Sequence, residues 1–398
     1  MMTTRGTKQD RAPSQKYDTG ERLASHEGGE TRLKRGSFDL PFFVLTLVIL
    51  TIGVVMVLSA SFASAYYTSG NPTKYFARQL FFAVTGVVIM IFVSKIKVAT
   101  FRKYAFVLFV IAVVLLAAVP IIGTKENGAK RWIDLGFTTF QPSEVLKLAE
   151  VLLFAVMICV YKEKMKTLKY GVLPFAGVVV LVVGLLFLEP HLSASVIIVL
   201  LAAIMMFAGG TKARWFVLAA FVVAAVALIT VTQFSYASDR ITAWLHPEAD
   251  PGDAGYQVLQ SLYAIGSGGL FGLGLGQGRQ KYLYLPEEHN DYIFAVVCEE
   301  LGYIGAIIIL LLFALLIVRG FWLALHAKDR FGSLVITGLT SLLAIQVFLN
   351  VAVVTNLLPS TGISLPFFSY GGTALWLQLV EMGMILSVSR DIPILRAG

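Results

Sequence analysis

Apolar stretches of about 20 residues recur along almost the entire chain, and this repetition restricts the fold more than any other feature. A bilayer accepts only helices or closed barrels, because backbone polar groups find no water in it. The apolar–polar alternation of barrel strands is absent. The chain is 57% hydrophobic and 14% charged, whereas soluble domains carry about 25% charge. The sequence therefore predicts an all-α polytopic membrane protein.

Ten membrane-spanning helices are predicted. Their expected ranges are 40–63, 76–94, 104–122, 143–161, 171–188, 192–209, 214–232, 292–318, 333–356 and 367–389. Residues 1–39 have almost no apolar periodicity and predict a disordered tail, and they lack the short apolar core of a cleaved signal peptide. A membrane domain over 40–390 and a C-terminal end at 391–398 are expected to follow.

The distribution of Lys and Arg predicts the orientation. Of the 32 Lys and Arg residues, 23 lie in the two termini and the loops on their side of the membrane, and eight lie in the alternate loops. Positive residues favour the cytoplasmic side, so both termini are predicted to be cytoplasmic. The net charge of +8 then reflects topology and does not indicate nucleic-acid binding. The long loop 233–291 is expected on the outer face.

That loop, between the predicted spans seven and eight, is the longest polar interruption. Within it, Ala254–Ile265 is amphipathic and predicts a helix lying in the membrane interface. The glycine run from Gly266 to Gly278 allows positive φ angles and close backbone approach to a ligand. It fits a mobile hinge or a phosphate cradle. Nucleotide binding is not favoured, because no strand precedes the glycines and no GK[ST] motif follows them.

A second irregular stretch is expected just before the last span. Residues 358–366 contain two prolines and a glycine at membrane depth. Irregular backbone at this depth is tolerated only where protein or a wet cavity surrounds it. We therefore expect a protein-lined cavity beside this segment.

Charged residues within the predicted fourth span are the first candidates for function. Glu144 and Lys147 are three residues apart and share a helix face, and Glu150 follows. Each charge costs about 2.5–3.5 kcal/mol on insertion scales. The residues are either a neutralised pair that stabilises the bundle or part of a polar cavity that binds a headgroup. Gln141–Ser143 before them is a helix start with proline in the first turn.

The loop 123–142 carries positive charge on the predicted outer face, against the general trend. Lys130 and Arg131 stand beside Trp132. A pyrophosphate or carboxylate ligand would explain them. Ordinary anchoring of Trp and Arg at the interface explains them equally well.

Asp291 opens the predicted eighth span. It is suited to be a helix N-cap, although Asn290 can do this equally well. As a partly desolvated carboxylate at the outer edge, it is also suited to be a general base for an attacking hydroxyl. One of Glu299 and Glu300 is expected to face the bundle interior. His191, in a short turn, is expected to be structural.

Motifs spread over residues 40–390 resemble those of the SEDS family (FtsW, RodA and SpoVE). In chain order they are Asn127–Ile133, Phe140–Glu144 with Lys147, Gly255–Gln257, Gln260–Ser261, Ala264–Gly269, Tyr284–Glu287 with His289 and Asp291, Phe294, Glu299–Gly302, Leu358–Gly362, Leu365–Phe367 and Ser369–Gly372. The long basic tail and the stretch 189–195 are more similar to the FtsW/SpoVE branch than to RodA. Where many members carry Asp, this chain has His191.

The resemblance implies a ten-span peptidoglycan glycosyltransferase in the bacterial cytoplasmic membrane. It further implies polymerisation of lipid II on the outer face, a class B penicillin-binding protein as partner, and association with divisome-type membrane proteins. The carboxylate at the position of Asp291 is implied to be essential, and the pair at Glu144 and Lys147 to be functionally important. Whether the role is in division, elongation or sporulation stays open.

The chemistry of lipid II suggests roles for further residues. Asp291 is the expected base for the acceptor hydroxyl. The conversion of an α-linked donor to a β-linked glycan is an inversion, which needs one base and no covalent nucleophile. The residues expected to bind substrate are Lys130, Arg131, Glu144, Lys147, Arg240, Lys281 and Glu300. Of these, Lys130, Arg131, Lys147 and Arg240 are the candidates to stabilise the departing pyrophosphate. The sequence assigns no cofactor, and a divalent cation (Mg²⁺ or Mn²⁺) is a further candidate for stabilising the pyrophosphate.

Two other functions fit the same features. A lipid II flippase would explain many spans, intramembrane charge and a broken helix, although the two halves show no matching pair of interrupted spans. A scaffold that only recruits the transpeptidase would need no catalytic carboxylate.

Overall fold

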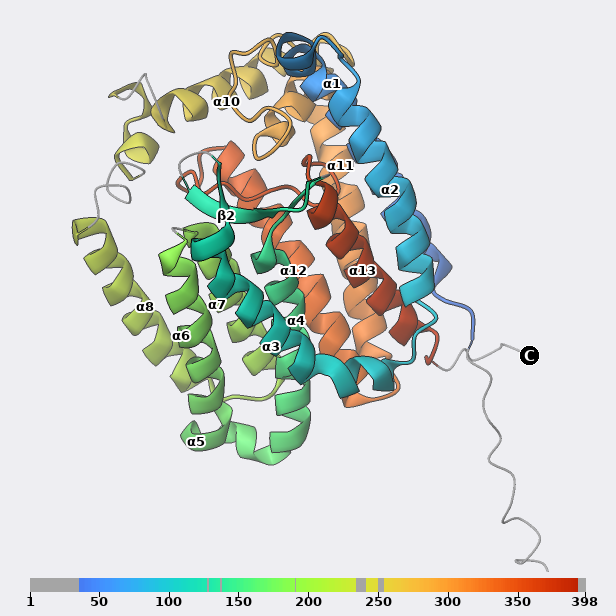
Figure 1. The fold of residues 1–398 in the computed structure, drawn as a ribbon, viewed down its shortest axis with the longest axis vertical. Coiled ribbons are helices and arrows are strands. Elements are labelled where there is room, and N and C mark those ends of the chain that lie inside the picture. The colour runs from blue at the N-terminus through green and yellow to red at the C-terminus, as the bar shows by residue number, and fades with distance from the viewer. Residues whose placement is uncertain are drawn as a thin grey trace, which may run out of the picture. The chain divides into compact units, whose positions relative to one another are not determined.

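The computed structural model describes residues 36–126, 129–136, 138–189, 191–233, 241–249 and 254–392. The predicted tail therefore lies outside the described residues up to Arg35, and so does Arg240. The described chain is a bundle of long helices with a small sheet and a short helix at one end (Figure 1).

The helices and strands follow the chain in this order: α1 (Leu40–Ser69), α2 (Lys74–Val93), α3 (Val98–Ile122), β1 (Thr124–Glu126), β2 (Ala129–Asp134), β3 (Thr139–Phe140), α4 (Pro142–Tyr161), η1 (Lys162–Lys166), α5 (Leu168–Gly171), α6 (Leu173–Leu188), α7 (Leu192–Ala208), α8 (Ala213–Gln233), η2 (Pro247–Ala249), α10 (Ala254–Gly268), α11 (Ile293–Leu325), α12 (Arg330–Val354) and α13 (Gly372–Ser389).

A helix occupies each of the ten predicted ranges, with α5 and α6 sharing the fifth. Within the described residues, seven helical stretches are long and apolar enough to cross a membrane, and Leu168–Leu188 is one of them. The other three ranges hold α4, which carries Glu144, Lys147 and Glu150, and the shorter apolar stretches of α7 and α8. The all-helical membrane architecture is thus confirmed.

Four predicted boundaries differ from the observed helix ends by five residues or more. The first helix ends at Ser69 instead of residue 63, and the third begins at Val98 instead of residue 104. The last span begins at Gly372, not at residue 367, because the preceding backbone is irregular: Phe367 has φ 64° and donates its N–H to Gln378 of α13. The eighth span continues seven residues beyond residue 318, to Leu325. Arg319 lies within this continuation, and its guanidinium binds Asp39, the N-cap of α1. Because the charge of Arg319 is paired in this way, the helix can continue past it.

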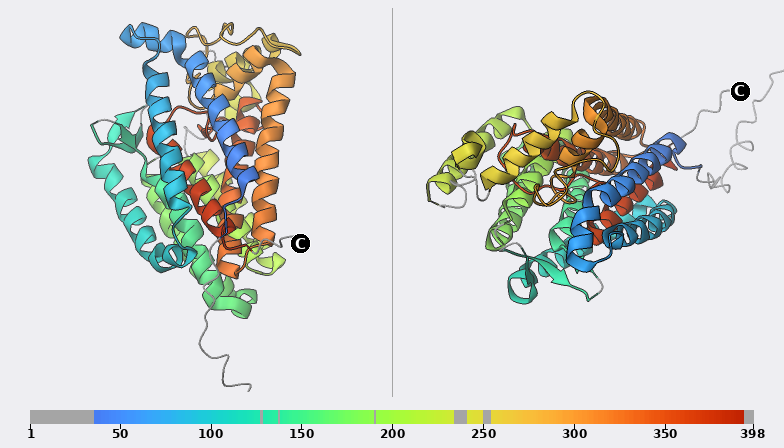
Figure 2. Two further views of the ribbon diagram at one scale, coloured as in Figure 1. Left: turned by 90° about the vertical axis from the view of Figure 1, so that its right-hand side faces the viewer. Right: turned by 90° about the horizontal axis from the view of Figure 1, so that it is seen from above.

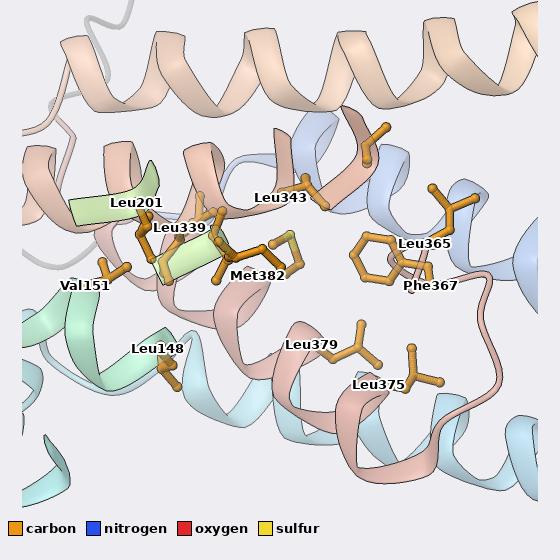
Figure 3. Packing of buried hydrophobic residues seen from close by; sticks show 14 of the residues in the cluster. Leu148, Val151, Leu201, Leu339, Leu343, Leu365, Phe367, Leu375, Leu379 and Met382 are labelled. Atoms are coloured by element: carbon orange, nitrogen blue, oxygen red, sulfur yellow. The ribbon is translucent and has the colours of Figure 1, made fainter. Parts of the chain in front are cut away.

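The bundle core lies around α12 and α13. Apolar side chains from α4, α7, α12 and α13 meet those of the irregular segment before α13 (Figure 3). Leu365 and Phe367 of that segment are fully buried. Protein thus covers Ser360, Ile363, Leu365 and Pro366 of the irregular stretch 358–366, whereas Gly362 is exposed, and the cavity expected beside this stretch stays a prediction.

A three-stranded antiparallel sheet in the loop 123–142 is a departure from the all-α prediction. β1 pairs with β2, and β2 with β3, where Ile133 lies opposite Phe140. The sheet satisfies backbone groups that have no helical partner. It lies at the same end of the bundle as α10, opposite α5 (Figures 1 and 2). We call this end the loop end.

The glycine run is explained by a break in α11. Gly302 has φ 69° and ψ −173°, which interrupts helical hydrogen bonding. Residues 269–281, called here the inserted segment, supply the missing partners through four backbone hydrogen bonds. They are Leu273 N to Glu299 O (3.0 Å), Gly274 N to Glu300 O (3.0 Å), Tyr303 N to Gly269 O (2.9 Å) and Ile304 N to Leu270 O (3.1 Å). Gly272 of the run thus closely approaches α11, and the hinge and phosphate-cradle interpretations of the run stay predictions.

Gly272→Ala is expected to lower the free energy of unfolding by about 2–5 kcal/mol. Gly272 has φ +80°, and a Cβ atom there would lie 2.1 Å from the carbonyl oxygen of Glu300. The left-handed backbone costs a side chain about 1–2 kcal/mol, and the overlap adds about 1–3 kcal/mol. Gly266→Ala is the control, since nothing lies within 4 Å of its Cβ position in α10. Thermal unfolding of the purified variants measures both, and equal midpoints would contradict the expectation.

Candidate functional site

Asp291 lies half-buried at the loop end, two residues before α11 begins. The N-cap position of α11 belongs to Tyr292, so Asp291 is not the cap residue. Its backbone carbonyl accepts a hydrogen bond from Asn350 Nδ2 (2.7 Å), which also donates to Ile363 O (2.7 Å). A Cβ atom on Gly362 would lie 3.2 Å from Asp291 Oδ2. The carboxylate therefore lies against the irregular segment before α13.

The residues just before Asp291 are bonded to the same segment. Ser369 Oγ donates to Asn290 O (2.8 Å), and Tyr370 N donates to His289 O (2.8 Å). The ring of His289 packs against Tyr75 of α2 and Tyr370, with centroids 4.7 and 5.8 Å away. The backbone around Asp291 is thus held by groups from α12 and from the irregular segment.

The predicted pair in α4 is formed. Lys147 Nζ lies 2.8 Å from Glu144, and the two side chains are 3% and 14% exposed. Glu381 of α13 lies within the electrostatic reach of both, and it is buried. The sequence analysis did not single out Glu381, although a carboxyl in the last span was a visible signal.

A second polar cluster joins the sheet to the turn between α6 and α7. His191 Nε2 lies 3.5 Å from Gln141 Nε2, and the charges of Arg131 and Lys147 both act on the His191 ring. Burial, with these two charges, lowers the pKa of His191 to about 3. Burial raises the pKa of Glu189 to about 8, against the opposing effect of Arg131. At neutral pH the cluster therefore holds a neutral imidazole, a protonated carboxyl and two cations.

The cluster and Asp291 border the same segment. Ser193, two residues after His191, donates a hydrogen bond to the carbonyl of Thr361. Thr361 precedes Gly362, which contacts Asp291. The side chains of Glu189 and His191 each keep one buried polar atom without a hydrogen bond in the structure, as does Thr361. Buried polar atoms of this kind are suited to a polar ligand.

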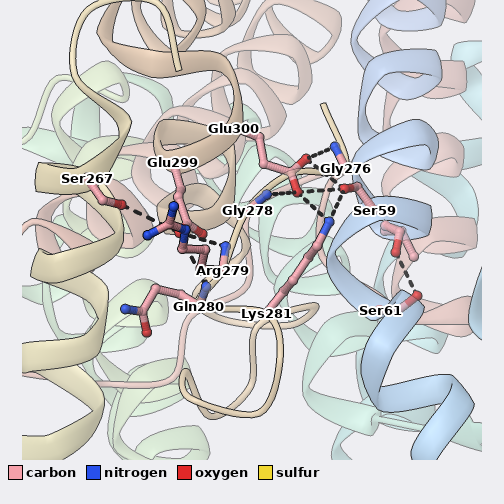
Figure 4. Close-up of polar contacts among 11 residues, drawn as sticks. Ser59, Ser61, Ser267, Gly276, Gly278, Arg279, Gln280, Lys281, Glu299 and Glu300 are labelled. Carbon is pink, nitrogen blue, oxygen red and sulfur yellow. Dashed lines mark hydrogen bonds and ion pairs between the residues drawn. The ribbon is translucent and has the colours of Figure 1, made fainter. Parts of the chain in front are cut away.

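The remaining predicted substrate-binding residues are placed differently. Lys130 is exposed and donates to the carbonyl of Pro120 at the end of α3 (3.3 Å). Lys281 and Glu300 form an ion pair of 2.7 Å with side chains 2% and 0% exposed, beside Ser59 of α1 (Figure 4). This geometry gives them a role in holding the inserted segment, and their binding of substrate stays a prediction. Arg240 lies outside the described residues.

The described residues contain no group of three His, Cys, Asp or Glu side chains arranged to hold a metal ion. No step below depends on one.

Glu189→Gln is expected to change how stability depends on pH. The unfolded carboxyl titrates near its ordinary value of 4.5, whereas the folded one titrates near 8. Between these values the folded protein keeps a proton that the unfolded chain releases, so the wild-type protein loses stability as the pH rises from about 4.5 to about 8. Glutamine cannot ionise, so the thermal midpoint of the variant should fall less over this range. Parallel curves would contradict the expectation.

The chain is similar to known proteins over most of its length. Residues 39–392 match the family model FtsW/RodA/SpoVE, described as "Cell cycle protein". Stage V sporulation protein E of Bacillus subtilis is 42% identical, over 90% of this chain and 98% of its own length. A probable peptidoglycan glycosyltransferase FtsW of Trichlorobacter lovleyi is 38% identical, over 89% of this chain and 94% of its own length.

Solved structures show the same likeness. A chain of a peptidoglycan synthase complex, described as coordinating polymerization and crosslinking, superposes with a TM-score of 0.75 at 27% identity, over 89% of this chain and 98% of that one. The rod shape determining protein RodA of Thermus thermophilus has a TM-score of 0.66 at 27% identity, over 89% of this chain and 97% of its own.

Proposed function

Because the chain belongs to the FtsW/RodA/SpoVE family of cell cycle proteins, it is a multi-pass membrane peptidoglycan glycosyltransferase of the FtsW/SpoVE type, and we propose that it polymerises lipid II with Asp291 as general base. The observation that carries the assignment is the half-buried carboxylate of Asp291, placed beside a segment that also borders a cationic cluster. Glycosyl transfer requires a base for the acceptor hydroxyl and a positive charge that stabilises the departing pyrophosphate.

In the proposed reaction, Asp291 accepts the proton of the acceptor sugar hydroxyl as that oxygen attacks the anomeric carbon of the donor. The bond from the anomeric carbon to the pyrophosphate oxygen breaks in the same step, so the linkage inverts without a covalent intermediate. Asn350 supports this role, because its bond to the backbone of Asp291 fixes the base without neutralising the carboxylate.

The departing pyrophosphate gains one negative charge, on the oxygen released from the anomeric carbon, and this charge must be stabilised. Arg131 and Lys147 are the best-placed candidates among the described residues, since their charges converge on His191. Arg131 presents a planar guanidinium suited to phosphate oxygens. His191 stays neutral at physiological pH, so the positive charge beside it comes from Arg131 and Lys147. Lys130 and Arg240 remain proposed contacts at the edge of this region.

We further propose that all ten helices cross the membrane, with both termini cytoplasmic and the loop end outside. The positive-inside distribution supports this orientation, and the common position of the sheet and α10 at the loop end agrees with it (Figure 2). Lipid II would then be bound from the outer leaflet.

A class B penicillin-binding protein is the proposed partner, within a divisome-type or sporulation assembly. The likeness to a chain of a synthase complex that joins polymerization to crosslinking supports this pairing. The higher identity to SpoVE and FtsW than to the RodA structure supports the division or sporulation branch.

Polymerisation by the purified full chain tests the proposal. The protein, solubilised in detergent with its transpeptidase partner, is supplied with labelled lipid II, and the products are separated by size. We expect glycan strands. Detergent micelles have no second leaflet, so a protein that only flips lipid II or only recruits the transpeptidase would yield none.

A further inference from the structure

Two adjacent carboxylates of α11 bind the backbone of the inserted segment. Glu299 accepts hydrogen bonds from the N–H groups of Arg279 (2.8 Å) and Gln280 (3.2 Å). Glu300 accepts from those of Gly276 (3.0 Å) and Gly278 (3.3 Å). Both side chains are buried, and charge-assisted bonds of this kind are stronger than neutral ones. The carboxylates therefore continue the attachment that the four backbone bonds begin at the break in α11.

The second carboxylate also attaches the segment to α1. Ser59 Oγ donates to Glu300 (2.6 Å), and Lys281 Nζ lies 2.7 Å from Glu300 and 3.1 Å from Ser59 Oγ (Figure 4). Lys281 neutralises the buried charge of Glu300, which makes the arrangement tolerable in an apolar setting. Glu300 of α11 thus binds α1 through Ser59 and the inserted segment through the backbone of Gly276 and Gly278 and the side chain of Lys281.

The stretch from Lys281 to Asp291 is short, and both of its ends are held: Lys281 is bonded to Glu300, and Asp291 directly precedes the N-cap residue of α11. It begins at the residue that binds Glu300, and it ends at Asp291, eight residues before Glu299 in the sequence. Leu285 is fully buried within it and donates its N–H to Gln280 O (2.9 Å). Because Lys281 is bonded to Glu300 of α11 and Asp291 directly precedes the N-cap residue of this helix, the attachment limits how far Asp291 can move.

We propose that Glu299 and Glu300 are positioning residues: they hold the inserted segment on α11 and thereby keep the Asp291 carboxylate at the angle from which it acts on the acceptor. The proposal rests on the proposed function, since it presumes that Asp291 reacts. The proposal gives Glu300 a positioning role in place of the substrate binding predicted from the sequence, since its side chain is buried and accepts hydrogen bonds from the inserted segment.

Two serines of α1 offer a matched test. Ser59 binds Glu300, whereas Ser61, two residues later and also buried, donates to the carbonyl of Val57 in its own helix (2.7 Å). Ser59→Ala and Ser61→Ala therefore remove the same hydroxyl from the same helix, with and without the attachment. Lys281→Met removes the counter-charge of Glu300 and should have the larger effect. If Lys281→Met folds poorly, Ser59→Ala still tests the proposal.

Two measurements are made on the full chain in detergent with its transpeptidase partner. Hydrogen exchange reports the amides of residues 273–280, and lipid II kinetics report kcat and KM separately. For Ser59→Ala we expect exchange about threefold faster and kcat about threefold lower, with KM unchanged. For Lys281→Met we expect exchange about tenfold faster and kcat about tenfold lower. Ser61→Ala should match the wild-type protein in both.

Unchanged exchange in Ser59→Ala and Lys281→Met would overturn the attachment. Faster exchange with an unchanged kcat, or a loss that falls on KM, would overturn the positioning role. A general loss of stability would instead affect Ser59→Ala and Ser61→Ala alike. Failure of the proposed function would appear separately, as wild-type polymerisation by Asp291→Asn, and the exchange result would still stand.

Discussion

Asp291→Asn is expected to lower kcat for lipid II polymerisation by at least about 100-fold, since a positioned general base contributes about 10²–10⁴-fold. Asparagine has nearly the same size as aspartate but cannot accept the proton of the acceptor hydroxyl. The bond from Asn350 goes to the backbone carbonyl of residue 291, so the local fold should remain. The measurement is initial rate against lipid II concentration, and KM should change little because substrate binding does not depend on the base.

Asp134→Asn is the matched control for this variant. Asp134 is an exposed carboxylate of β2 at the same end of the bundle, and its side chain accepts a hydrogen bond from Gly136 N (2.7 Å). The same chemical change there should leave the rate unaltered. A wild-type rate in Asp291→Asn would show that another group accepts the proton, or that the protein serves only as a scaffold.

Lys147→Met is expected to cost about 3–5 kcal/mol of folding free energy, the usual penalty when one partner of a buried ion pair is removed. Glu144 would keep its charge in a largely buried place, 2.8 Å from where the ammonium stood. Lys166→Met is the control, because Lys166 and Glu163 form a pair with the same spacing whose side chains are 61% and 83% exposed. It should leave the thermal midpoint unchanged.

The double variant Glu144→Gln with Lys147→Met separates stability from chemistry. It removes both charges, so most of the lost stability should return. Polymerisation should stay low, because no ammonium remains to stabilise the pyrophosphate. If the double variant recovered the rate together with the stability, the pair would be structural and the assignment of Lys147 to the leaving group would be wrong.

Much of the helical framework could be predicted from local patterns. Each predicted span coincides with a helix because apolar length and the exclusion of unpaired backbone from lipid act within single segments. The pairing of Glu144 with Lys147 was predictable for the same reason, since a spacing of three residues places both on one helix face. The position of Asp291 at the start of α11 also followed from the sequence.

The partners of the glycine run were not predictable in this way. Ser59 and Lys281 are 222 residues apart in the chain, and no local period relates them. A hinge and a phosphate cradle both account for glycines locally, but the structure places Gly272 and Gly302 against each other's backbone at a break in α11. The cluster of Arg131, Glu189 and His191 is of the same kind, because it joins a strand to a turn between two other helices.

The bilayer explains why some features could be predicted from the sequence and others could not. A bilayer imposes its demands on each segment separately, so the number, length and charge of the helices can be derived residue by residue. Which side chains meet depends on how helices distant in sequence pack, and that packing is decided by the shapes of the whole bundle. The sequence therefore sufficed to propose Asp291 as the reacting carboxylate and to single out Glu299 and Glu300, and the folded chain was needed to show that both glutamates bind the backbone of the inserted segment.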